Sequence, residues 1–351
     1  MNASEQIQDA NIRHQVYLQR YSTQVVNRIM KLLAKVDRRL ATRLAKADMT
    51  TLSRARMEKM LDNIRTINVQ AYKVVAGEIR SELREFAKYE AAFQARIIEN
   101  ALPVALDVVT PAAAQLYSAV AARPFQGRLL KEWVKDMEAG AARRLRDAVR
   151  MAVVDGTTTD ALVRQVIGTA AGKYKDGILE TSRRGATAMV RTALNHTATV
   201  AREQVYKENT DLIKGVKWIS TLDGRTSAIC RARDGMVLLP DKGPRPPAHI
   251  NCRSSTTPVL KSWKELGIDL KEAPEGTRAS MNGQVPANET YQTWLKKQPK
   301  DFQDETLGVT KGKLYRKGGL TLDKFVDNSG HEYTLPQLRR REAAAFEKAG
   351  L

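Results

Sequence analysis

The chain has 351 residues, of which 42% are hydrophobic and 6% aromatic, so it can bury a substantial core in two or three domains. No run of 18 apolar residues predicts a membrane-spanning helix, and the first residues lack the basic and apolar regions of a secretory signal. The net charge of +19 favours acidic partners such as nucleic acid, yet no zinc-finger, RNP or basic-zipper pattern predicts sequence-specific binding.

Residues 4–47 predict one long amphipathic helix. Apolar side chains recur there at three- and four-residue steps, Arg and Lys occupy the other face, and neither Gly nor Pro interrupts the pattern. A helix of about 40 residues is roughly 60 Å long, so we expect it to pack against other helices or neighbouring subunits. Residues 48–51 predict a break with a helix N-cap, and residues 52–98 predict a second long helix.

Shorter helices are expected after the second long one. Pro111 suits a first helical position, and Pro124 would close that helix. Residues 127–154 predict the next helix, and residues 157–160 can cap a shorter one behind it. A last long helix is predicted over residues 176–208.

After residue 215 the pattern changes from helical to short β-type runs separated by turns. We predict strands at residues 216–220, 236–239 and 253–260, and a short helix at residues 226–233 with Thr226 as its N-cap. Residues 240–248 contain four prolines and cannot form a central strand or a helix.

From about Pro274 onward the composition is that of loops, with helices predicted around residues 290–297 and 302–307 and after Pro336. The large apolar residues of this tail should form a satellite core or pack against the Trp218 region: Trp294, Phe302, Leu307, Leu314, Tyr315 and Phe325. The predicted fold is α+β and mainly α, with long N-terminal helices, a small α/β unit with a short sheet, and a mixed C-terminal tail. The predicted domains are 1–170, 171–265 and 266–351.

The order of residues in the α/β unit resembles a known family. The sequence runs Asp223-Gly-Arg225-Thr226, then Cys230, Asp234-Gly235 and Pro246-Pro247-x-His249-x-x-Cys252-Arg253. Together with Arg191 and Trp218 upstream, it resembles the phage head morphogenesis proteins, the Mu F-like minor capsid family, over roughly residues 170–262. Members often carry a cysteine three residues before the position of Cys230, where this chain has Ser227.

The resemblance implies a structural protein, not an enzyme, in the head of a tailed phage. Its implied partners are the portal protein and the major capsid or scaffold protein during procapsid assembly, and nonspecific DNA, with no membrane contact. It implies a place in the capsid interior of the virion, after assembly in the host cytoplasm, and the protein could leave the head with the DNA. The motif residues that it implies are Arg191, Trp218, Asp223, Arg225, Thr226, Asp234, Gly235, Pro247 and Arg253.

Cys230, His249 and Cys252 are candidate zinc ligands. The first comes from the predicted short helix and the other two from one turn, so the three can converge. In a structural site the fourth ligand would be Asp223 or water. An open fourth position would suit a catalytic zinc, for which Asp234 is a loose candidate as general base. A disulfide between the two cysteines requires an oxidising medium, and two cysteines in this chain fit a reducing cytoplasm.

A metal-free interpretation is preferred from the sequence alone, and it needs no cofactor. Asp223 can cap a turn or pair with Arg225 or Arg191, Thr226 can cap the short helix, and Arg253 can bind a carboxylate through two hydrogen bonds. Gly235 permits a turn, and Pro246–Pro247 presents a rigid extended edge. The motif would then specify the fold and carry no chemistry.

Two other functions compete with the capsid role. Some proteins with this family's domain carry a C-terminal toxin enzyme, so residues 266–351 could hold a small nuclease or an ADP-ribosyltransferase-like effector, with Lys311, Arg316 or His331 in its site. A general DNA-binding module with no capsid role would keep binding DNA in high salt or would prefer one sequence, whereas the DNA contacts of a capsid protein should be nonspecific and salt-sensitive. The sequence contains no phosphate-binding loop, dinucleotide-binding glycine motif, serine-hydrolase elbow or zincin motif.

Overall fold

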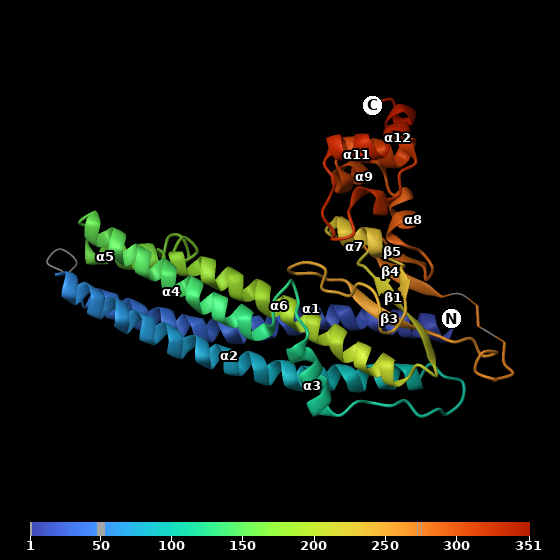
Figure 1. The fold of residues 1–351 in the computed structure, drawn as a ribbon, viewed down its shortest axis with the longest axis horizontal. Helices are drawn as coiled ribbons and strands as arrows, with labels where there is room; N and C mark the ends of the chain where they lie inside the picture. The colour runs from blue at the N-terminus through green and yellow to red at the C-terminus, as the bar shows by residue number, and fades with distance from the viewer. Residues whose placement is uncertain (1, 48–52, 272, 275) are drawn as a thin grey trace. The chain divides into compact units, whose positions relative to one another are not determined.

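The computed structural model describes residues 2–47, 53–271, 273–274 and 276–351, so the break predicted at residues 48–51 lies outside the described residues. The chain is α+β and mainly α, as predicted, with long helices first and two small antiparallel sheets later (Figure 1). Among the described residues, no helix is both long and apolar enough to cross a membrane.

The chain forms two compact units, each built from segments that lie far apart in the sequence. We call them the helical unit, which contains Gln19–Phe86 and Tyr117–Thr197, and the sheet unit, which contains Met1–Leu18, Ala87–Leu116 and Ala198–Leu351. Three long helices, all predicted, contribute residues to both units: α1 (Ala3–Ala45), α2 (Arg54–Glu99) and α6 (Ile178–Glu208). The domain boundaries at residues 170 and 265 stay a prediction.

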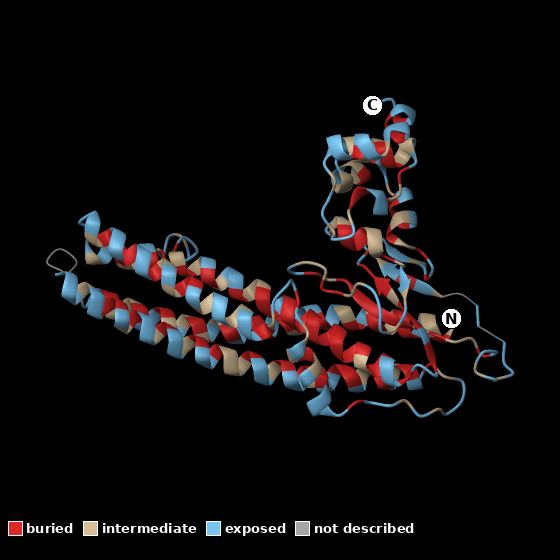
Figure 2. Cartoon of the chain, viewed as in Figure 1, coloured by how far each residue is buried: buried red, intermediate tan, exposed pale blue. Residues whose placement is uncertain are grey.

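The helical unit is held together by apolar stripes along its helices. Besides its parts of the long helices it contains the end of α3 (Ala113–Ala122), α4 (Leu130–Val154) and α5 (Thr159–Ile167). Side chains at three- and four-residue spacing are buried in its core, among them Leu40, Leu44, Ile64, Leu145, Val149 and Leu162. Burying one such side chain contributes about 1.5–3 kcal/mol. Figure 2 shows these buried stripes beside exposed polar faces.

The sheet unit is organised around a three-stranded antiparallel sheet. Its strand order is β2-β1-β3, from β2 (Val237–Leu238), β1 (Ile213–Ile219) and β3 (Ser255–Leu260). Trp218 on β1 pairs with Thr256 on β3, and its indole is fully buried. That indole packs with Cys230 of α7 (Ala228–Arg233) and with Cys252. The predicted strands and the short helix are therefore confirmed. β1 begins three residues earlier than expected, whereas β2, β3 and α7 are slightly shorter.

The C-terminal part of the sheet unit is more ordered than its loop-like composition suggested. Residues expected to form loops make a hairpin of β4 (Thr277–Ser280) and β5 (Gly283–Pro286). The helices and helical turns that follow are α8 (Tyr291–Lys296), α9 (Lys300–Leu307), α10 (Val309–Lys313), η2 (Leu314–Gly318), η3 (Leu322–Phe325), α11 (Leu335–Arg341) and α12 (Ala343–Ala349). They enclose a core around Trp294, Leu314, Tyr315 and Phe325, which confirms the predicted satellite core.

Buried polar contacts join the ends of the long helices to the sheet within the sheet unit. Glu90 of α2 accepts a hydrogen bond from Arg202 of α6 at 2.5 Å and pairs with His14 of α1 at 2.7 Å. Asn11 of α1 donates to Thr257 of β3 at 3.2 Å. Burial alone would raise the pKa of Glu90, but the charge of Arg202 and the hydrogen bond with His14 outweigh it and lower that pKa to about 2.

Candidate metal centre

The three candidate ligands come from two short segments that follow β1 and precede β3. Cys230 is the third residue of α7, and it is buried against Trp218. His249 and Cys252 share one turn, in which the Cys252 N–H donates to the His249 carbonyl at 3.2 Å. Asn251 has a φ of 58°, a left-handed conformation that asparagine tolerates, and it bends the chain back towards α7.

The two sulfur atoms and the imidazole nitrogen form a compact cluster. Cys230 Sγ lies 3.6 Å from Cys252 Sγ and 3.4 Å from His249 Nε2. All three ligand atoms lie within 4.8 Å of one another. Both cysteines are buried thiols outside any disulfide, whereas His249 is half-buried. The residues that the sequence singled out as ligands are therefore brought together by the fold.

The tautomer of His249 is defined by its second nitrogen. Nδ1 lies 2.9 Å from the Ile250 carbonyl, which can only accept, so Nδ1 carries a proton, and Nε2 is the nitrogen that faces the cluster. The Ser227 hydroxyl lies 2.7 Å from Nε2. Ser227, not Thr226, is the N-cap residue of α7, but its side chain makes no capping bond. The prediction of Thr226 as N-cap is wrong, because its hydroxyl donates to the Thr221 carbonyl at 2.6 Å.

The two thiols have different acidities. The hydrogen bond that joins them, together with burial, raises the pKa of Cys230. The same bond lowers the pKa of Cys252, and the hydrogen bond and charge of His249 lower it further. The bond with Cys252 in turn raises the pKa of His249. Two cysteine sulfur atoms with an imidazole nitrogen are a ligand set that suits a soft divalent metal.

The motif contains a second polar contact, the ion pair of Arg253 with Asp223. Arg253 donates two hydrogen bonds to Asp223, at 2.7 and 2.8 Å, in the bidentate arrangement expected of it. The Asp223 carboxylate also accepts from the backbone N–H of Arg225 at 3.0 Å. Burial would raise the pKa of Asp223, but the bonds and charge of Arg253 outweigh it and lower that pKa. Asp223 is thus committed to Arg253, and the oxygen nearest to His249 is that of Ser227.

Residues 143–257 match the family described as Phage Mu protein F like protein. This segment is Mu F-like. The match confirms the resemblance predicted from the sequence, and it covers about a third of the chain, including all nine motif residues and the three candidate ligands. Neither a curated protein nor a solved structure matches the chain.

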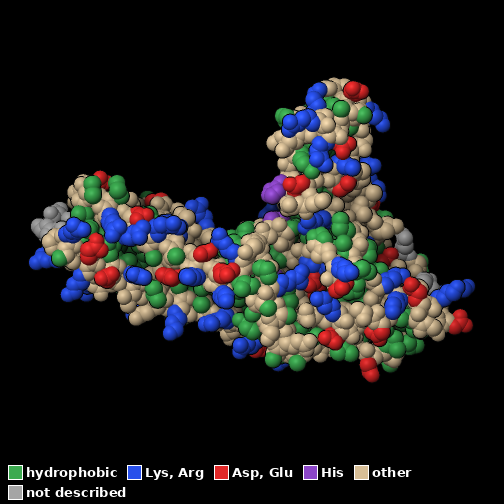
Figure 3. Space-filling view, viewed as in Figure 1, with side chains coloured by type: hydrophobic (Ala, Val, Ile, Leu, Met, Phe, Trp, Pro, Cys, Tyr) green, Lys and Arg blue, Asp and Glu red, His purple; other side chains and the backbone are tan. Residues whose placement is uncertain are grey.

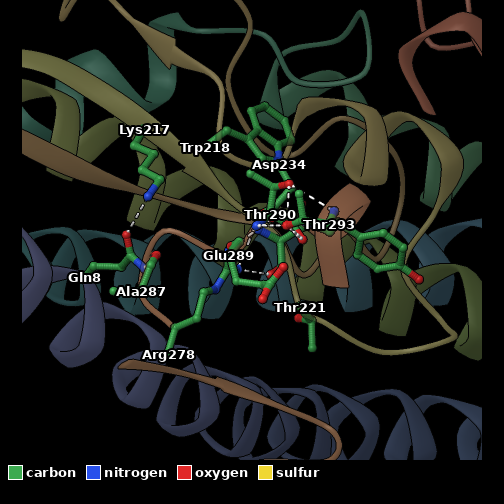
Figure 4. Close-up of polar contacts among 12 residues, drawn as sticks. Gln8, Lys217, Trp218, Thr221, Asp234, Arg278, Ala287, Glu289, Thr290 and Thr293 are labelled. Atoms are coloured by element: carbon green, nitrogen blue, oxygen red, sulfur yellow. Dashed lines mark hydrogen bonds and ion pairs between the residues drawn. The ribbon is translucent and has the colours of Figure 1, made fainter. Parts of the chain in front are cut away.

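Asp234 of the Mu F-like segment is the centre of a buried network (Figure 4). Its carboxylate accepts from the backbone N–H of Ser220 at 2.6 Å, from that of Tyr291 at 2.7 Å, and from the Arg278 guanidinium at 3.0 Å. Arg278 also donates to the carbonyls of Ser220 and Glu289, at 2.7 Å each. Asp234 therefore joins the end of β1 to β4 and α8. Its carboxylate is occupied by these structural contacts, an arrangement that does not suit a general base.

Sequence reasoning missed Arg278, which is 1% exposed and lies outside the Mu F-like segment. It stands in a polar stretch without apolar alternation, so nothing local marks it as buried. The only sequence signal for such a residue was the Asp234-Gly235 turn, because a carboxylate that becomes buried there requires a hydrogen-bonding or charged partner. Gly235 has a φ of 84°, and a Cβ there would lie 2.7 Å from Thr290 Cγ2, so the segment that packs on Asp234 also requires the glycine.

The remaining motif residues, Arg191 and Pro247, and the three residues suggested for an effector site are not among the candidate ligands of the cluster. Arg191 is exposed on α6 in the helical unit, and Pro247 follows a cis peptide bond in the loop before His249. In the C-terminal part, Lys311 pairs with Glu332, Arg316 pairs with Asp304, and His331 pairs with Asp327. Each of the three residues suggested for an effector site is thus engaged with a different carboxylate.

Proposed function

We propose that this chain is a minor head protein of a tailed phage that acts structurally in procapsid assembly. The observation that carries the proposal is the Mu F-like match over residues 143–257, a family of phage head proteins. The matched motif is held by the partly buried ion pair of Asp223 with Arg253 and by the buried pair of its Asp234 with Arg278, which together form a scaffold. Such a scaffold suits a protein that is assembled into a particle.

The proposed protein partners are the portal protein and the major capsid or scaffold protein, and the proposed location is the capsid interior after assembly in the host cytoplasm. The test is to produce the chain together with the portal, scaffold and major capsid proteins of the same phage, and to separate particles by sedimentation. We expect the chain to sediment with the particles at low copy number. When the portal protein is omitted, the chain should no longer sediment with them. A chain that stays at the top of the gradient would contradict the proposal.

Nonspecific DNA is the third proposed partner, and the distribution of charge supports the helical unit as the part that contacts it. The segments of that unit contain 29 Lys and Arg against 15 Asp and Glu, a net charge of +14. Those of the sheet unit contain 29 against 24, a net charge of +5. Lys and Arg side chains gather on the visible face of the helical unit (Figure 3). A surface of this kind binds phosphates by releasing counterions.

The DNA contact is tested by titrating short duplexes of two unrelated sequences at several salt concentrations. Exposed Lys35, Arg38 and Arg39 of α1 are changed together to Gln, and exposed Lys296, Lys300 and Lys317 of the sheet unit serve as the matched control. We expect equal affinity for both sequences, and the α1 variant should lower the slope of log K against log salt by about 0.9 for each phosphate that it no longer neutralises. An equal reduction in the control variant would contradict the assignment to the helical unit.

A further inference from the structure

We propose that Cys230, His249 and Cys252 bind one Zn²⁺ ion, with an oxygen ligand at the position of Ser227. This inference concerns the cluster itself and stands independently of the capsid role. It departs from the metal-free interpretation that the sequence alone favoured, because the geometry of the cluster and its surroundings could not be read from the sequence.

Two of the three separations between the ligand atoms are close to the edges of a zinc tetrahedron, and all three are within 4.8 Å. With Zn–S of about 2.3 Å and Zn–N of about 2.05 Å, tetrahedral angles give S···S of about 3.8 Å and S···N of about 3.6 Å. The observed separations are 3.6 Å between Cys230 Sγ and Cys252 Sγ and 3.4 Å between Cys230 Sγ and His249 Nε2. Both pairs need to open by only about 0.2 Å to admit the ion.

The surroundings of the three ligands fit a metal site as well. The Nδ1–H of His249 donates to the Ile250 carbonyl, which is the kind of second contact that orients a metal-binding imidazole. The backbone of Cys230 is held by the Ser220 hydroxyl, which donates to the Cys230 carbonyl at 2.8 Å. Cys230 and Cys252 also pack against the buried indole of Trp218, so both sulfur atoms are fixed by well-packed neighbours.

The fourth position faces a small open pocket beside Ser227. The Ser227 hydroxyl lies 2.7 Å from His249 Nε2, and Ser227, Cys230 and His249 all line this pocket. The pocket there is polar and is lined by Thr221, Arg225, Thr226, Asn251 and Ser254. Asp223, the other oxygen donor considered, is held by Arg253. The fourth ligand is therefore the Ser227 hydroxyl or a water molecule that it holds.

We infer a structural role for this ion. Cys230 and Cys252 lie 22 residues apart, and the chain between them contains β2 and the proline-rich loop. One ion bound to both residues closes this loop and ties α7 to the segment that leads into β3. Because such a site rarely exists in the unfolded chain, the free energy of binding the metal adds to the stability of the fold.

The test is metal analysis of the full-length chain purified under reducing conditions without chelator. We expect about one zinc per chain by mass spectrometry of the elements, and less than a tenth of that in Cys252→Ser. Replacement of the metal with Co²⁺ should produce thiolate-to-cobalt charge-transfer absorption and the intense visible bands of a tetrahedral site. A wild-type chain without zinc, or zinc retained in Cys252→Ser, would overturn the proposal.

A variant that strengthens the site guards against the case in which Cys252→Ser fails to fold. Ser227→Cys provides a third thiolate at the fourth position, so it should release zinc to a chelator at least tenfold more slowly and should raise Tm in the presence of zinc only. Ser118→Cys, at an exposed position on α3, is the matched control and should change neither quantity. Equal release from Ser227→Cys and the wild type would refute the position of the fourth ligand.

Discussion

The helical unit and the sheet unit bury their charges differently. Among the described residues of the sheet unit, the ion pairs of Glu90 with Arg202, Asp234 with Arg278 and Glu203 with Arg245 are almost completely buried. Among the described residues of the helical unit, most ion pairs lie at the surface, although the pair of Asp37 with Arg183 is largely covered, with side chains 9% and 21% exposed. The helical unit thus relies on its apolar stripes, whereas the sheet unit is also pinned by buried charges whose partners are far apart in the sequence.

This difference predicts which mutations each unit tolerates. A surface ion pair contributes about 0–1 kcal/mol, so its removal leaves an amphipathic helix packed. A buried pair contributes little net stability while intact, but removing one partner leaves an uncompensated charge. We therefore expect single charge changes to damage the sheet unit far more than the helical unit.

The largest effect is expected for Asp234→Ala, because it leaves the Arg278 guanidinium buried without its carboxylate. The expected cost in the free energy of unfolding is about 3–5 kcal/mol, measured by urea denaturation. The double change Asp234→Ala with Arg278→Met should recover part of this stability. A double variant no more stable than Asp234→Ala would show that the two residues are not coupled.

Trp218→Ala should destabilise the sheet unit by about 3–5 kcal/mol, because its fully buried indole fills the space between β1 and α7. A thermal melt that does not change would contradict the place of Trp218 in the core. The comparison within the helical unit is Leu145→Ala, for which about 2–5 kcal/mol is expected from the reduced burial alone.

The stability of the two units should also depend on pH over different ranges. In the helical unit, burial lowers the pKa of His196 to about 4, although its hydrogen bond with the Val120 carbonyl opposes this. Because that value lies below the unfolded value of about 6.5, the stability is fully present above pH 6.5 and is lost as pH falls towards 4, by about 3 kcal/mol. Hydrogen exchange of α4 and α6 peptides at pH 7, 5.5 and 4 measures this change, and His196→Gln should reduce the pH dependence.

The sheet unit provides the contrast in that experiment. The folded-state pKa of Glu90 is lowered to about 2, so its contribution is present above its unfolded pKa of about 4.3 and is lost only as pH falls further towards 2. Peptides around Glu90 should therefore stay protected at pH 5.5, where the helical unit has begun to weaken. Simultaneous loss of protection in both units would contradict this difference.

The smallest effect is expected for Arg150→Ala in the helical unit, which removes the ion pair with Glu58. Both side chains are about half exposed, at 49% and 50%. Removal of the pair should change the free energy of unfolding by about 0–1 kcal/mol, and added salt should shrink the difference further. A decrease above about 2 kcal/mol in a urea titration would exceed what an exposed pair contributes, and would show that surface charges matter more to the helical unit than its geometry indicates.

The sequence by itself determined the long helices, the three short strands, the family resemblance and the three residues that cluster as candidate metal ligands. These features are local: apolar residues at helical spacing without Gly or Pro define α1, and residues typical of turns mark the ends of the strands. Tertiary structure alone decided that Arg278 pairs with Asp234 and that β4 and β5 form a hairpin. It also decided that the Ser227 hydroxyl contacts His249 and makes no helix-capping hydrogen bond. Gln8, for example, donates to the carbonyl of Ala287, 279 residues away. The physical reason is that a side chain's partner across such a separation depends on how whole elements pack, which no local pattern of residues encodes.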